Sequence, residues 1–79
     1  MDRASIFEKL TEVFQDVFDD DSIALTDDTT AADIEDWDSL THITLLATVE
    51  EEFGMKFSMK AVQGMKNVGE MVDLIAAAV

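Results

Sequence analysis

Hydrophobic residues near the start of the chain recur at i, i+4, i+7 and i+8, which is the spacing of one helical face. Acidic residues occupy the opposite side. The pattern predicts an amphipathic helix over residues 4–18, begun either by Asp2 or by a capping box of Ser5 with Glu8. Its apolar face consists of Ile6, Phe7, Leu10, Val13, Phe14, Val17 and Phe18.

Residues 19–37 show no such period and are rich in aspartate, threonine and serine. These side chains compete for backbone hydrogen bonds and favour turns, so we predict a long loop. A loop of this length in a small domain needs its own apolar residues to hold it against the core. The candidates for this role are Ile23, Leu25, Ile34 and Trp37.

A second helical pattern covers residues 38–53. Asp36 or Asp38 can cap its start, and Gly54 is suited to end it, because glycine adopts the left-handed conformation at low cost. The predicted buried face of this helix is Leu40, Ile43, Leu46, Ala47, Val49 and Phe53.

Two further helical segments follow. Residues 59–64 fit one short helix stopped by Gly64, and residues 67–78 fit a last helix begun by Asn67 with Glu70. The face of the last helix is Val68, Met71, Val72, Ile75 and Val79. No alternation of strand length occurs. We therefore predict one all-α domain over residues 1–79, a small bundle of three main helices, one short helix and a long first loop.

The net charge of −13 on 79 residues restricts the partners. Like charge repels nucleic acid and anionic membrane surfaces, whereas basic protein surfaces are attracted. The negative charge lies almost entirely in residues 1–54. No apolar stretch has the length of a signal peptide core or a membrane span. We expect a cytoplasmic monomer with neither nucleic acid nor membrane as partner.

Catalysis and metal binding are poorly supported. The chain lacks cysteine, and its only histidine, His42, follows Ser39 by three residues on the same helix. A serine nucleophile also needs an orienting third group and an oxyanion hole, and neither is indicated. We interpret His42 as an exposed helix residue. The acidic loop lacks the glycine of a calcium-binding loop, so no metal site is expected.

Ser39 lies at or just inside a helix N-terminus, where free N–H groups and the helix dipole suit a phosphodiester on its hydroxyl. Spacing alone fits two interpretations, a modification site and an ordinary first-turn residue. Because the chain has no cysteine, any thioester chemistry needs a thiol from outside the sequence.

The segment WDSLTHITLLATVEEEFG resembles the carrier proteins of fatty acid, polyketide and nonribosomal peptide synthesis. Asp38, Ser39 and Leu40 match the D-S-L motif that opens the second helix of that family, and the closing NVGEMVDLI is similar too. The resemblance covers essentially the whole chain. It implies the acyl-carrier-protein fold, with 4′-phosphopantetheine attached to Ser39 by a phosphopantetheinyl transferase.

The resemblance also implies a covalent carrier and not an enzyme. The arm would hold an acyl group as a thioester and present it to acyl- or aminoacyl-transferring and synthase enzymes with basic docking surfaces. Glu50, Glu51 and Glu52 are the docking candidates. The acyl pocket candidates, each equally interpretable as ordinary core, are Leu46, Val49, Phe57, Val62, Val68 and Met71.

Three departures from the family pattern favour a specialised carrier over the housekeeping carrier of fatty acid synthesis. Thr41 and Thr44 stand where acids are usual, residues 55–66 are basic and rich in methionine, and Trp37 precedes the D-S-L motif. Trp37 also fits the role of a loop anchor. The alternatives are an aminoacyl carrier, D-alanyl or peptidyl, and an unmodified acidic docking module.

Overall fold

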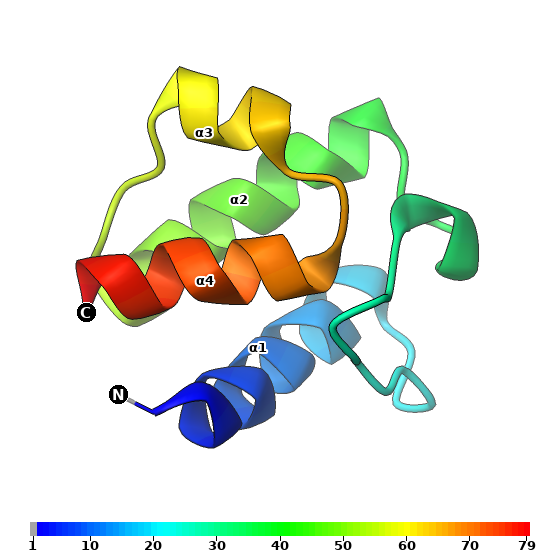
Figure 1. The fold of residues 1–79 in the computed structure, drawn as a ribbon. Helices are drawn as coiled ribbons and strands as arrows, with labels where there is room; N and C mark the ends of the chain where they lie inside the picture. The colour runs from blue at the N-terminus through cyan, green and yellow to red at the C-terminus, as the bar shows by residue number, and fades with distance from the viewer. Residues whose placement is uncertain (1) are drawn as a thin grey trace.

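Four α-helices and one 3-10 turn make up the fold in the computed structural model, which describes residues 2–79 (Figure 1). No strand occurs within these residues, which confirms the predicted all-α class. The elements in chain order are α1 (Arg3–Phe18), η1 (Ala31–Asp33), α2 (Ser39–Phe53), α3 (Met59–Gly64) and α4 (Val68–Ala78).

The core lies where α1, α2 and α4 meet, because α1 contacts both of the other long helices. Figure 1 shows α3 crossing one edge of this arrangement, and the start of α1 and the end of α4 lie on the same side. Each long helix contributes buried residues. The buried apolar residues are Ile6, Leu10, Val13, Phe14, Phe18, Ile34, Leu45, Val49, Phe53, Val68, Met71, Val72 and Ile75.

Side-chain caps fix the helix ends close to the predicted positions. Asp2 caps α1 by accepting the Ser5 N–H at 2.8 Å, so Asp2 and not the Ser5 box begins this helix. Asn67 caps α4 by accepting the Glu70 N–H at 2.9 Å. Gly54 ends α2 with a φ of 63°, as predicted from its freedom in the left-handed region.

The predicted buried face of α2 is partly wrong. Val49 and Phe53 are buried and Leu46 is half-buried, but Leu40 is 78% and Ile43 67% exposed. Ala47 is also exposed, whereas Leu45, absent from the predicted face, is fully buried. The reason is that the first half of α2 carries apolar residues on two sides, so the hydrophobic period fits two orientations of the helix.

The end of α4 also differs from the prediction. Val79 was placed on the buried face of this helix but is 41% exposed. The helix ends at Ala78, so Val79 follows the last helical residue and lies beyond the core. The other four predicted positions of this face are buried.

The long loop packs against the bundle through the four predicted apolar residues. Ile34 is buried, and Ile23, Leu25 and Trp37 are partly buried against the core, which confirms their role as anchors. The loop also contains η1, which was not predicted. Its Thr30 N–H donates to the Asp33 carboxylate at 2.9 Å, a local contact that closes the turn.

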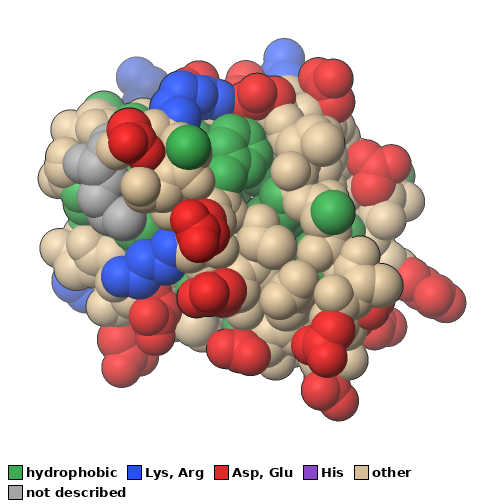
Figure 2. Space-filling model, turned by 90° about the horizontal axis from the view of Figure 1, so that it is seen from below, with side chains coloured by type: hydrophobic (Ala, Val, Ile, Leu, Met, Phe, Trp, Pro, Cys, Tyr) green, Lys and Arg blue, Asp and Glu red, His purple; other side chains and the backbone are tan. Residues whose placement is uncertain are grey.

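Charge dominates the surface. Figure 2 shows many acidic side chains and few basic ones on the face seen from below, in keeping with the net charge of −13. Arg3 is one of the few cations, and it forms ion pairs with Asp27 of the loop and Asp73 of α4. In the part of the chain that the structure describes, none of the helices has the length and apolar character needed to cross a membrane.

Candidate functional site

Ser39 is the first residue of α2 and is exposed to solvent. Asp38 caps this helix by accepting the N–H groups of Leu40 and Thr41, each at 2.9 Å. The Thr41 hydroxyl in turn accepts the Asp38 N–H at 2.8 Å, which completes a reciprocal capping box. The Ser39 hydroxyl takes part in none of these bonds and is left free at the start of a 15-residue helix.

The capping bonds also affect the charge of Asp38. The hydrogen bond from the Thr41 backbone N–H lowers the pKa of the Asp38 carboxyl below its ordinary value, and the Leu40 N–H adds to this effect. Asp38 is therefore an anion at neutral pH that is already paired with the helix N-terminus. This arrangement fixes the residue at which α2 begins and so the place of Ser39 as its first residue.

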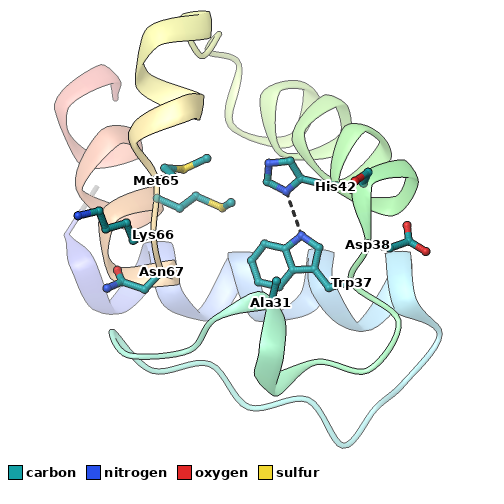
Figure 3. A pocket seen from close by; sticks show the side chains of 9 residues that line it. Ala31, Trp37, Asp38, His42, Met65, Lys66 and Asn67 are labelled. Atoms are coloured by element: carbon teal, nitrogen blue, oxygen red, sulfur yellow. Dashed lines mark hydrogen bonds between the residues drawn. The ribbon is translucent and has the colours of Figure 1, made fainter.

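A cavity of about 370 Å³ lies beside Ser39, and Ser39 contributes to its wall. Residues from η1, the residues just before α2 and its first turn, the segment between α3 and α4, and α4 itself line it (Figure 3). Its lining residues are Ala31, Trp37, Asp38, Ser39, His42, Met65, Lys66, Asn67 and Met71. A group bound to the Ser39 hydroxyl can therefore enter a preformed cavity without crossing the core.

One wall of the cavity is a pair of rings. The Trp37 indole Nε1–H donates to His42 Nδ1 at 2.9 Å, and the two rings stack with centroids 5.8 Å apart. Trp37 is fixed from behind by Phe14, whose ring it meets edge to face at 5.2 Å, and by Phe18 at 6.3 Å. In Figure 3 the Met65 side chain lies across from these rings. The wall is thus tied to the core through Trp37.

The interpretation of His42 as an exposed helix residue is wrong. His42 is half-buried, lines the cavity and accepts a hydrogen bond from Trp37. The available signal was its position three residues after Ser39, which places both on one side of α2. That signal was incomplete, because the contact with Trp37 depends on how the loop returns to the helix.

The predicted acyl pocket residues are only partly gathered at this cavity. Met71 lines it. Val49 and Val68 are fully buried in the core, and the remaining three are half-buried away from the cavity wall: Leu46, Phe57 and Val62. Sequence reasoning did not assign Ala31, Met65, Lys66 or Asn67 to the site. These residues come from separate segments, so no local pattern connects them to Ser39.

The three glutamates predicted to dock partners differ in their surroundings. The Glu50 carboxylate accepts the Phe57 backbone N–H at 2.8 Å and is half-buried, so it links α2 to the segment before α3. Glu51 and Glu52 are exposed. Of the three, only these two have side chains fully available to a partner.

The chain is similar in sequence to one protein family and to individual proteins of known sequence. The family described as "Phosphopantetheine attachment site" matches residues 8–75. An acyl carrier protein of Coprothermobacter proteolyticus is 31% identical over 75 residues, which cover 95% of this chain and 92% of that protein. One from Saccharopolyspora erythraea is 27% identical over 74 residues, covering 94% and 78% respectively.

A solved structure is also similar. The solution structure of a holo acyl carrier protein from Geobacter metallireducens superposes with a TM-score of 0.86 at 45% sequence identity. The match covers 90% of this chain and 82% of that one. The similarity therefore extends over nearly all of the fold described above.

Proposed function

The chain belongs to the acyl carrier proteins, whose prosthetic group is 4′-phosphopantetheine, and we propose that Ser39 is the residue that bears this group. Members of this family are carriers and not catalysts. The observation that carries the proposal is the position of Ser39, exposed at the first turn of α2 and at the wall of the cavity.

The residues around Ser39 fit the group. The exposed hydroxyl is accessible to a transferase, and the N-terminus of α2 favours the negative charge of a phosphodiester. Asp38 adds a negative charge nearby, but its carboxylate is engaged by two backbone N–H groups of the same helix end. The adjoining cavity of about 370 Å³ has apolar walls for the aliphatic part of the arm and polar groups for its oxygens.

When bound, the group supplies a flexible arm whose terminal thiol holds an acyl group as a thioester. The chain itself has no cysteine and depends on this external thiol. Its own residues position the attachment point: Asp38 and Thr41 fix the helix start, while Trp37 and His42 form the adjacent wall.

We further propose that the carrier serves a specialised acyl pathway, such as a polyketide or modified fatty acid pathway. Three features support this. Thr41, which stands where the family usually has an acid, is used in the capping box, and Trp37 is built into the cavity wall. Lys60 in α3 and Lys56 just before it are exposed, so this part of the surface carries positive charge on a protein that is otherwise strongly acidic.

The family acts with phosphopantetheinyl transferases and synthase enzymes. We propose that basic surfaces on these enzymes meet the exposed carboxylates of Glu51 and Glu52. The large negative charge supports this, since it raises the rate of encounter with basic surfaces.

Attachment can be tested by intact mass after co-expression with a broad-specificity phosphopantetheinyl transferase. The wild type should gain the mass of one phosphopantetheine group, and Ser39→Ala should not. Ser5→Ala is the matched control, because Ser5 is an exposed serine in the first turn of α1 and keeps its backbone N–H bond to the Asp2 cap when the hydroxyl is removed. A mass increase that persists in Ser39→Ala, or no increase in the wild type with several transferases, would contradict the proposal.

A further inference from the structure

The hydrogen bond between Trp37 and His42 determines which ring nitrogen of His42 carries the proton. The indole nitrogen of tryptophan is only a donor, so His42 Nδ1 must accept in the 2.9 Å contact. A neutral imidazole that accepts at Nδ1 has its proton on Nε2. Trp37 therefore holds His42 in the tautomer that presents an Nε2–H donor.

This donor faces the cavity. In Figure 3 the second ring nitrogen of His42 points away from Trp37, on the side of the ring toward Met65. Within residues 2–79, the bond with Trp37 is the one hydrogen bond made by the imidazole. The Nε2–H is therefore available to a molecule in the cavity.

The other cavity residues offer few acceptors. Oδ1 of the Asp38 carboxylate accepts the N–H groups of its own helix end, which leaves Oδ2 as an acceptor, and the Asn67 side-chain oxygen accepts the Glu70 N–H at 2.9 Å. Met65 and Met71 contribute thioethers, which are weak acceptors. The His42 Nε2–H therefore has no hydrogen-bond partner among these cavity residues, and an oxygen of a group that enters the cavity can supply one.

His42 also lies close to the attachment point. Residues three apart on a helix are neighbours, with Cβ atoms about 5–6 Å apart. Both residues line the cavity, so for a group attached to the Ser39 hydroxyl the parts nearest the attachment point are the ones within reach of Nε2.

We propose that His42 binds the phosphopantetheine arm, its Nε2–H donating to an oxygen in the part of the arm nearest Ser39. The arm is then held in the cavity between the Trp37–His42 pair and Met65 instead of extending into solvent. The acceptor is an oxygen of the tethered group, either on the phosphodiester or a hydroxyl or carbonyl just beyond it. This inference rests on the proposed attachment to Ser39 and assigns a second residue to the same site.

The test is NMR of protein with ¹⁵N-labelled histidine, with and without the arm, after mass spectrometry has established attachment. In both forms the ring nitrogens should show the Nε2–H tautomer. Exchange of the Nε2 proton with water should slow by about two- to tenfold on attachment, the range expected for one net hydrogen bond. Contacts between arm protons and the Met65 methyl group should appear.

Two variants keep the test decisive. Trp37→Phe retains a packed ring but removes the donor, so part of the His42 population should change tautomer and the slowing should shrink. His42→Phe should remove the contacts between arm and Met65. A ³¹P shift change in His42→Phe assigns the acceptor to the phosphodiester, and an unchanged shift assigns it to the arm beyond.

Equal exchange of the Nε2 proton with and without the arm would overturn the inference, as would a His42 ring protonated on Nδ1 instead of Nε2 in the protein that carries the arm. Failure of the proposed function gives a different result, since the mass of the protein would then not increase at all. A mass increase without a response of His42 would contradict this inference alone.

Discussion

Gly69 lies directly against Asp27. The Gly69 N–H donates to the Asp27 carbonyl at 3.0 Å, and the neighbouring Val68 N–H donates to the Thr29 carbonyl at 2.8 Å. The long loop therefore satisfies N–H groups at the start of α4 that have no partner inside the helix. A Cβ atom on Gly69 would lie 2.7 Å from the Asp27 carboxylate and 2.8 Å from its carbonyl oxygen. Glycine is needed here for space.

Replacing Gly69 by alanine should therefore destabilise the fold. We expect Gly69→Ala to lower the free energy of unfolding by about 1–3 kcal/mol, because the backbone of the loop must move to make room. Gly64→Ala is the control, since a Cβ at Gly64 meets no atom within 4 Å. That variant should be unchanged or up to about 1 kcal/mol more stable. Urea denaturation of both measures this, and equal stabilities would contradict the close packing at Gly69.

The orientation of α2 gives a second prediction. Leu45 is fully buried and Leu40 is 78% exposed, so the same substitution at the two positions should have very different effects. Leu45→Ala should cost about 2–5 kcal/mol of unfolding free energy, and Leu40→Ala less than about 0.5 kcal/mol. Thermal and urea unfolding would show the difference. Comparable losses at both positions would indicate that the helix is rotated from the orientation described.

Local signals in the sequence predicted the helices and their ends well. Caps such as Asn67 and Gly54 act within one turn, so their chemistry is visible in a few neighbouring residues. The rotation of α2 was not predictable in this way. Leu40 and Ile43 fit one apolar face and Leu45 and Val49 another, and the packing against α1 decides between them.

The site was predictable only in part. Asp38, Ser39 and Leu40 are consecutive, and their motif is recognisable in the sequence. The cavity is formed by two stretches far apart in the chain, residues 31–42 and 65–71, and the Trp37 ring that meets His42 also packs on Phe14 of α1. Such contacts depend on tertiary structure, which explains why His42 was misinterpreted.

The capping carboxylate of Asp38 predicts a pH dependence. Because the pKa of Asp38 is lowered in the folded protein, its contribution to stability is complete above the ordinary value of 3.8 and is lost as the pH falls through the lower, folded value. Asp38→Asn keeps a capping side chain but removes this titration. The melting temperature of the wild type should exceed that of Asp38→Asn most at neutral pH, and the difference should shrink below pH 3.8.

Removing any acid also relieves repulsion in a chain of net charge −13, so a matched variant is needed. Asp36→Asn removes the same charge two residues away, where the side chain does not cap α2. Its melting temperature provides the reference for the loss of charge alone. If Asp38→Asn and Asp36→Asn show the same pH profile, the capping bonds of Asp38 make no specific contribution.

The last prediction separates docking from folding among the three glutamates. Glu51→Lys reverses an exposed charge, so it should slow modification by the transferase several-fold at low salt and leave the melting temperature nearly unchanged. The effect should diminish with added salt, because the screening length falls from about 10 Å at 0.1 M to about 3 Å at 1 M. Glu50→Ala, in contrast, removes the acceptor for the Phe57 N–H and should cost about 1 kcal/mol of stability. The modification rate is measured by stopping the reaction at set times and recording the intact mass, and stability is measured by thermal melts. Together they distinguish an effect on docking from an effect on folding. Equal modification rates for Glu51→Lys and the wild type at low salt would exclude a docking role for this residue.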